Sequence, residues 1–286
     1  MSSIPAFPEA LAPCELLQNV CWLEQTEVDV PAGNDWLSAY EVACLGRLRF
    51  AKRRADWRLG RWTAKRAIAA CLNLTSDSHT LAAIEIRAAS SGSPELLLSG
   101  RPAPIVVSLS HSAGVAICAL ASGRATASDT SLGCDVEAVE LRSDAFIGDY
   151  FTASEQALTQ QTPAEKRPLL VTVLWSAKES ALKALREGLR LDTRSVEVSL
   201  GSAFQQQSKK CSGSSFPAPP LTLAGIWHPL QVRHESGPAF HGWWCHNDQF
   251  VRTIVSRPPA RLPIHVSEIG TSEGFNPQLT IPAIRP

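Results

Sequence analysis

Residues 168–187 read PLLVTVLWSAKESALKALRE, and this stretch indicates how the chain is built. It opens with a proline, which a first helical turn accepts, and Gly188 follows as a stop, so we expect one long helix here. Its centre, WSAK (175–178), has an echo in WTAK (62–65), inside a second long helix expected over 45–72. Three identical positions and one similar position can also arise by chance. If the echo is real, the chain is two related halves and a site could lie between them.

The rest of the sequence indicates a mixed α and β fold. A capping box at Thr152-Ala153-Ser154-Glu155 predicts a helix start. Residues 205–220 are rich in Pro and Ser and predict a mobile loop, and the tail over 258–286, with six prolines, predicts an irregular segment on the surface. Short strands are expected over 105–109, 115–121, 132–137, 221–227, 238–245 and 249–255.

Composition excludes several classes of protein. Lys and Arg number 27 and so do Asp and Glu, so the net charge is zero and a general polyanion binder is not expected. The start lacks a signal peptide, and the longest apolar stretch has nine residues, so we expect neither secretion nor a membrane span. Eight scattered cysteines without a CxxC pair indicate reduced thiols, a cytoplasmic location and no zinc site.

The helix expected over 45–72 is strongly basic. Residues 47–66 hold nine of the 27 basic residues against one acid, Asp56. Arg54, Arg58, Arg61 and Lys65 share one helical face. Clustered guanidinium groups suit phosphate recognition, while the alternative is a solvated helix face.

Carboxylates gather in two other motifs. On a strand over 132–137, Asp135 and Glu137 project from one face while Leu132, Cys134 and Val136 pack inward. Paired carboxylates suit Mg²⁺, although an exposed edge strand would also carry them.

On the helix expected over 168–187, Glu179 and Lys183 lie one turn apart on the same face. Glu179 could be a third metal ligand and Lys183 a phosphate-binding residue, or the two could form a surface ion pair. Ser108-Leu109-Ser110-His111-Ser112 could bind an anion, or be a turn with a core histidine. Together these pieces are the parts of a phosphoryl-transfer site, without a GxxxxGK[ST] loop.

In this order the motifs resemble the 4′-phosphopantetheinyl transferases of the two-halved type that serves peptide, polyketide and fatty-acid synthases. The resemblance spans about residues 45–190. Its elements are GRWTAKRA (60–67), GSP (92–94), SLSHS (108–112), GCDVE (133–137), FTASE (151–155) and WSAKES (175–180) with Lys183. One departure is Ser93, where many relatives carry Lys or Arg.

The resemblance implies an α+β fold of two pseudo-twofold-related halves, each a long helix on a small antiparallel sheet, with coenzyme A in the cleft between them. The halves would be 1–125 and 126–257, followed by the tail 258–286. The implied reaction moves the phosphopantetheine arm of coenzyme A onto a serine of an apo carrier protein and releases adenosine 3′,5′-bisphosphate. We expect a cytoplasmic monomer that binds no nucleic acid or membrane.

The resemblance also implies roles for individual residues. The metal site for Mg²⁺ would consist of Asp135, Glu137 and Glu179, and the catalytic residues would be Glu179, as ligand or base, and Lys183. The coenzyme would be bound by Arg58, Arg61, Ser110, His111, Lys178 and Lys183.

The sequence also allows other functions and other roles for some segments. The segment 141–151, with Phe146, Ile147, Tyr150 and Phe151, could be an apolar docking surface for the carrier protein or simply core. A nucleic-acid-binding module that uses the basic helix, a metal-dependent nucleotide phosphohydrolase and an inactive scaffold of the same fold are the alternatives. His228, His234, His241 and His246 fit no ligand pattern and are expected in strands and loops.

Overall fold

The computed structural model describes residues 19–122, 130–187, 190–201 and 226–268. The mobile loop predicted over 205–220, the first residues of the strand predicted over 221–227, the stop at Gly188 and most of the tail lie outside these ranges. The boundary predicted at residues 125 and 126 also falls outside them and stays a prediction.

The N-terminal part of the chain builds two small sheets around one long helix. Four strands form a sheet in the order β12-β1-β6-β5, and three form a second sheet in the order β2-β3-β4. In chain order the elements are β1 (Cys21–Thr26), α1 (Ala39–Gly46), α2 (Ala51–Cys71), α3 (Ser78–Ala83), β2 (Ile84–Ala88), β3 (Pro94–Leu98), β4 (Arg101–Pro102), β5 (Ile105–Ser112) and β6 (Val115–Ser122).

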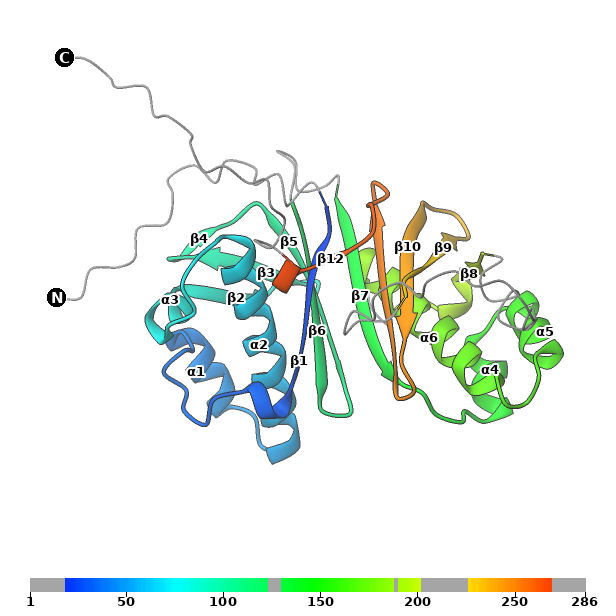
Figure 1. The fold of residues 1–286 in the computed structure, drawn as a ribbon, viewed down its shortest axis with the longest axis horizontal. Helices are drawn as coiled ribbons and strands as arrows, with labels where there is room; N and C mark the ends of the chain where they lie inside the picture. Colours follow the sequence, from blue (N-terminus) through cyan, green and yellow to red (C-terminus); the bar gives the residue numbers. More distant parts are fainter. Residues whose placement is uncertain (1–18, 123–129, 188–189, 202–225, 269–286) are drawn as a thin grey trace, which may run out of the picture.

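The C-terminal part repeats this plan with a single sheet. Five antiparallel strands follow the order β7-β11-β10-β9-β8. Its elements are β7 (Ser131–Ala138), α4 (Asp144–Tyr150), α5 (Ala153–Gln161), α6 (Arg167–Ala184), β8 (Val196–Leu200), β9 (His228–His234), β10 (Ala239–His246) and β11 (Phe250–Arg257). The order β1-β6-β5 corresponds to β7-β11-β10, so the fold is α+β with two similar halves (Figure 1).

The WTAK and WSAK motifs occupy corresponding places on α2 and α6. Lys65 forms a buried ion pair with Glu41, 2.5 Å away, and Lys178 forms one with Glu155, 2.8 Å away. Each glutamate closes a capping box, at the start of α1 and of α5 respectively, and the second box confirms the helix start predicted at Thr152. The echo therefore reflects one structural device used twice, in which a buried lysine ties a long helix to a short one.

The helix expected over 45–72 is two helices in the structure. α1 ends at Gly46, and α2 begins at Ala51 after Phe50 at its N-cap. α1 is attached to β2 because the Glu41 carboxylate accepts a hydrogen bond from the Ile86 N–H. α2 instead packs on β1 and β6, so the chain has to change direction between the two helices. Helical periodicity in the sequence does not reveal such a turn.

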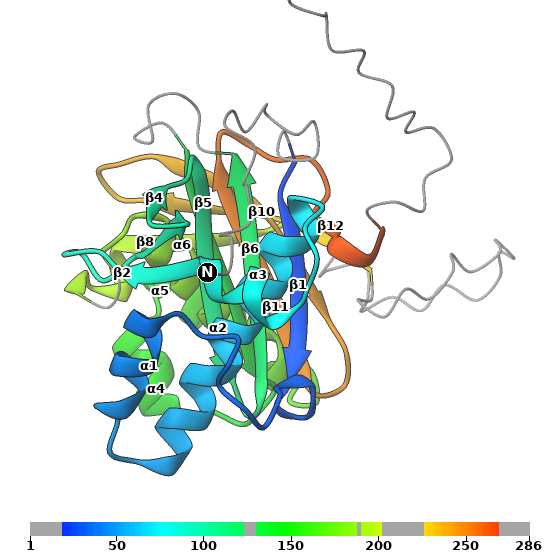
Figure 2. The same cartoon turned by 90° about the vertical axis from the view of Figure 1, so that its left-hand side faces the viewer.

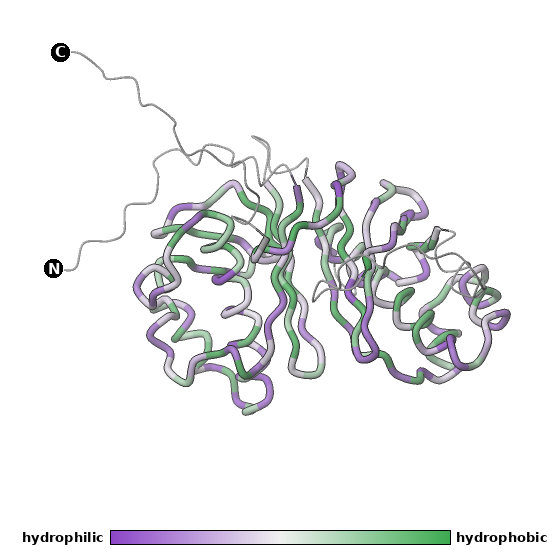
Figure 3. The backbone as a smooth tube through the Cα atoms, in the orientation of Figure 1, coloured by the Kyte–Doolittle hydropathy of each residue, from purple (hydrophilic) through white to green (hydrophobic). Residues whose placement is uncertain are grey.

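Each half has its own hydrophobic core, and a third cluster joins the two. α2 lies over the first core and α6 over the second. The joining cluster combines Trp22 and Ile117 of the N-terminal half with Cys134, Val136 and Ile254 of the C-terminal half. Figure 2 shows the arrangement from the N-terminal side, and Figure 3 shows hydrophobic stretches in the central strands. Burial of this apolar surface fixes β5 and β6 against β7.

Part of the predicted irregular tail is ordered and returns to the N-terminal half. β12 (Ile264–His265) pairs in parallel with β1. The His265 ring packs edge-on against Trp22 at 4.7 Å, and Val266 is buried in the N-terminal core. No helix among the described residues is long and apolar enough to cross a bilayer.

Candidate functional site

Three carboxylates that are far apart in sequence meet at one point. Asp135 and Glu137 extend from the same face of β7, and Glu179 comes from α6. One oxygen of each lies within 4.8 Å of the others. Leu132, Cys134 and Val136 face the joining cluster, so the alternation predicted for this strand is confirmed. Within the described residues this is the only group of three or more potential metal ligands.

A close approach of α6 to β7 brings the carboxylates together. A Cβ added at Gly133 would lie 1.8 Å from the Ser180 carbonyl oxygen, so this position accepts only glycine at that separation. On the neighbouring strand β11, the Thr253 hydroxyl bonds with those of Ser176 (2.9 Å) and Ser180 (2.7 Å). These contacts hold Glu179 over Asp135.

Lys183 lies inside the carboxylate cluster. Its ammonium donates to Asp135 Oδ1 at 2.7 Å, to Ser110 Oγ at 2.8 Å and to the Cys134 carbonyl at 3.2 Å, and it lies 3.8 Å from Glu179 Oε2. Burial by itself would lower the pKa of Lys183, but the charges of Asp135 and Glu179 raise it above its ordinary value. The lysine is therefore a fixed cation at this site.

The other half supplies a row of serines to the site. Ser108, Ser110 and Ser112 alternate along β5, which runs beside β7. Ser108 Oγ accepts from the Cys134 N–H at 2.9 Å, Ser110 donates to Asp135 Oδ1 at 2.6 Å, and Ser112 donates to Glu137 Oε2 at 3.3 Å. The carboxylates thus belong to one half and are oriented by hydroxyl groups of the other.

The electrostatics of the cluster favour a bound cation. Burial, together with repulsion from Asp135 and then Glu179, raises the pKa of Glu137 to about 7. Burial and repulsion from Asp135 likewise raise the pKa of Glu179. Asp135 Oδ2 is buried and has no hydrogen-bond partner. Three carboxylates, one of which has a buried oxygen without a hydrogen-bond partner, fit as ligands of a hard divalent cation such as Mg²⁺.

Two side chains at the site, those of Arg142 and Trp175, were not predicted from the sequence. Arg142 Nη2 lies 3.6 Å from Glu137 Oε2 and 2.9 Å from Glu140 Oε1, and its guanidinium stacks 5.0 Å above the Phe146 ring. Trp175 forms a side-chain hydrogen bond with Glu137. Arg142 follows β7 in an irregular segment, where no periodicity indicates direction. Trp175 was noted for its motif, but spacing alone did not connect it with Glu137.

Two arginines predicted to bind coenzyme are occupied elsewhere. Arg58 donates to the carbonyl oxygens of Pro31, Ala32 and Gly33. Arg61 stacks on the Trp57 ring at 4.9 Å and lies 3.9 Å from Glu41, and burial lowers its pKa. Both side chains hold the N-terminal half together, and the structure does not bring them to the carboxylates.

His111 lies at the end of β5, as the resemblance implied, next to Ser110. The principal charges that act on it are those of Asp56, Lys183, Lys52 and Asp135. The carboxylate cluster and the start of α2 therefore both lie within electrostatic reach of this imidazole.

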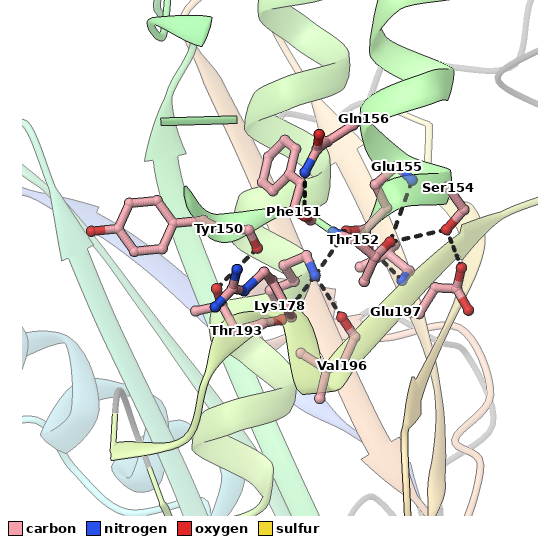
Figure 4. A network of polar contacts seen from close by, with 12 residues as sticks. Tyr150, Phe151, Thr152, Ser154, Glu155, Gln156, Lys178, Thr193, Val196 and Glu197 are labelled. Carbon is pink, nitrogen blue, oxygen red and sulfur yellow. Dashed lines mark hydrogen bonds and ion pairs between the residues drawn. The ribbon is translucent and has the colours of Figure 1, made fainter. Parts of the chain in front are cut away.

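Lys178 also differs from its expected role. Its side chain is fully buried, donates to the carbonyls of Thr193 and Val196 at 2.9 and 2.5 Å, and pairs with Glu155 at 2.8 Å (Figure 4). Three partners use all three ammonium hydrogens, which leaves none for a coenzyme.

A cavity of about 570 Å³ opens beside the cluster. Lys183 and Ser108 line one side, and the loop at Gly92-Ser93-Pro94 with Arg87 lines another. The Ser93 hydroxyl lies 2.8 Å from that of Ser91, so the residue that replaces a basic side chain is engaged locally. The cavity adjoins Lys183, which contacts the acids, so a phosphate-bearing ligand in the cavity would lie next to this ammonium group.

Comparison with known proteins agrees with the motifs. Residues 131–219 match the family model of the 4′-phosphopantetheinyl transferase superfamily. No curated protein matches the chain. Among solved structures, the chain is similar to a holo-(acyl-carrier-protein) synthase from Bacillus anthracis str. Ames in complex with CoA (3′,5′-ADP), with 20% identity and a TM-score of 0.30 over 36% of this chain and 92% of that chain.

The matched segment contains β7 and α6, and with them the three carboxylates and Lys183. The family match therefore confirms, for residues 131–219, the resemblance to the 4′-phosphopantetheinyl transferases that the motifs predicted.

Proposed function

We propose that the protein transfers the 4′-phosphopantetheine arm of coenzyme A to a serine of an apo carrier protein and releases adenosine 3′,5′-bisphosphate. The observation that carries this proposal is the carboxylate cluster with its unpartnered oxygen, Asp135 Oδ2, joined through Lys183 to a cavity. The family match over residues 131–219 supports the same reaction class.

In this proposal Asp135, Glu137 and Glu179 hold Mg²⁺. When bound, the ion would neutralise charge on the pyrophosphate of the coenzyme. Ser110 and Ser112 keep Asp135 and Glu137 oriented toward the ion from the opposite half. The site would then be complete within one chain, which supports a monomer.

The transfer itself is a single displacement at phosphorus. The serine oxygen of the carrier protein forms a bond to the phosphorus next to the pantetheine arm. The bond from that phosphorus to the bridging oxygen breaks, and adenosine 3′,5′-bisphosphate leaves with the electron pair. Lys183, already a fixed cation, stabilises the charge on the leaving phosphate. The serine proton goes either to Glu179, in which case Asp135 and Glu137 hold the ion, or to a water molecule, in which case Glu179 is the third ligand.

Ser110 and His111 remain our candidates for contacts with the nucleotide phosphates, together with Lys183. Arg58, Arg61 and Lys178 are not included, because their side chains hold other parts of the protein. The six described cysteines form no disulfide with one another, which supports the cytoplasmic location that we propose.

The test is intact mass spectrometry of an apo carrier protein incubated with coenzyme A, Mg²⁺ and this protein. We expect the carrier to gain one phosphopantetheine mass, and adenosine 3′,5′-bisphosphate to appear in equal amount. Asp135→Asn should slow the mass gain on the order of 10² or more, whereas Glu140→Gln, a change to an exposed acid nearby, should not. Phosphate release from nucleotides without any carrier modification would instead identify a phosphohydrolase.

A further inference from the structure

The segment 141–151 is mostly core rather than a docking surface, and its aromatic rings support an arginine beside the carboxylates. Phe151 is buried in the C-terminal core. Phe146 packs against Trp175, with ring centroids 5.0 Å apart. The guanidinium of Arg142 lies over the other side chain's ring system, 5.0 Å from the centre of Phe146. The aromatic cluster therefore fixes where this guanidinium can lie.

Arg142 makes two ionic contacts of unequal strength. Its Nη2 lies 2.9 Å from Glu140 Oε1, which is hydrogen-bond distance, and 3.6 Å from Glu137 Oε2, which is too long for a hydrogen bond. Its Nε is buried and has no hydrogen-bond partner. The side chain is 24% exposed, so a ligand can reach it. The contact with Glu137 is thus the one that Arg142 can give up most easily.

The charges of the site are already close to balance without a metal. Lys183 pairs with Asp135 and with Glu179. Arg142 pairs with Glu137. Three carboxylates and two cations leave one net negative charge. A divalent ion alone would give the site one net positive charge and would be repelled by both cations. A phosphate-bearing ligand supplies negative charge, so the ion and such a ligand should bind better together than separately.

We propose that Arg142 exchanges partners: it holds Glu137 while the site lacks a metal, and it contacts the phosphates of the coenzyme once Mg²⁺ occupies Glu137. This inference rests on the proposed function and adds a positioning residue that makes the ion and the coenzyme bind cooperatively. A guanidinium suits both partners, because its fork matches carboxylate and phosphate oxygens alike. The Phe146 ring keeps it beside the site in either state. Such coupling is reciprocal, so each ligand strengthens the binding of the other.

Titration calorimetry with Mg²⁺ alone, at low ionic strength, tests the competition for Glu137. Arg142→Gln removes the competing cation and should tighten the binding of Mg²⁺ roughly tenfold. Arg142→Met, which keeps an unbranched stem on Phe146, should do the same. An arginine that only supports the fold would give the opposite sign, because its loss would loosen Glu137 and weaken the ion. Arg233→Gln is the matched control, since Arg233 is exposed and lies on β9, and it should bind Mg²⁺ as wild type does.

The same titration in the presence of coenzyme A, without a carrier protein, tests the exchange. Coenzyme A should tighten the binding of Mg²⁺ to the wild-type protein roughly tenfold or more, and this factor should be several-fold smaller in Arg142→Gln. Melting temperatures in EDTA show that the variants are folded.

The outcomes separate this proposal from the proposed function. If the wild-type protein modifies no carrier but both calorimetric results hold, the function fails and the partner exchange stands. If transfer proceeds and neither Arg142→Gln nor Arg142→Met binds Mg²⁺ alone more tightly than wild type, the partner exchange is overturned. A coenzyme factor in Arg142→Gln equal to that of wild type would overturn it equally.

Discussion

Glu137→Gln should stabilise the metal-free protein while it removes the response to Mg²⁺. In the metal-free cluster Glu137 faces Asp135 and Glu179, and burial with this repulsion raises its pKa from the ordinary value of 4.5 to about 7. Such a shift corresponds to roughly 3 kcal/mol at about 1.36 kcal/mol per pKa unit. The side chain is only 18% exposed, so solvent screening removes little of this energy.

The sign follows from proton binding. Between pH 4.5 and about 7 the folded protein binds the Glu137 proton more tightly than the unfolded chain does, so the free energy of unfolding falls as the pH rises through this window. Glutamine carries no charge at any pH and avoids the loss. Because Arg142 also loses a partner, we expect a net gain of about 2 kcal/mol at pH 8, or roughly 4–8 °C in Tm for a chain of this size. At pH 4 the two proteins should melt together.

Differential scanning calorimetry in EDTA and in excess Mg²⁺, at pH 4 and pH 8, makes the measurement. Wild type should gain Tm with Mg²⁺ at pH 8, and Glu137→Gln should not. Glu140→Gln is the control, since Glu140 is 55% exposed and lies outside the cluster. A Glu137→Gln protein that is less stable than wild type at pH 8 without metal would refute the repulsion on which this reasoning depends.

Four further outcomes are expected. Asp135→Asn should reduce the transfer rate on the order of 10² or more, measured by carrier mass, while the circular dichroism spectrum stays that of wild type. Gly133→Ala should cost about 3 kcal/mol of stability in urea unfolding, because its Cβ would lie 1.8 Å from a carbonyl oxygen of α6; a Tm equal to wild type would contradict the close approach. Lys178→Met should cost about 3–5 kcal/mol by leaving a buried carboxylate unpaired, yet keep the KM for coenzyme A in the folded fraction. In titration calorimetry, His111→Ala should weaken the binding of coenzyme A by about 1.5–3 kcal/mol more than it weakens the binding of dephospho-coenzyme A. Arg61→Ala should change the binding of both ligands equally.

The sequence by itself determined the features that depend on one element. A strand has a period of two, so Asp135 and Glu137 share a face, and a helix brings residues four apart together, so Glu179 and Lys183 are neighbours. The capping box at Thr152 and the order of the motifs are equally local. These observations placed each pair on one face of its own element, the family resemblance implied that the two pairs form one site, and the structure brings them together.

The tertiary structure decided which charges belong to the site. WSAK contains Lys178 and continues into Glu179, yet Lys178 is buried under α5 while Glu179 faces Asp135. Arg58 and Arg61 share a helical face that looks suited to phosphate, but the loop at residues 31–33 and Glu41 occupy it. Periodicity states the direction of a side chain relative to its own helix or strand. The partner that a side chain meets depends on which other element packs against it. Burial then determines whether a charge stabilises the fold or remains available to a ligand.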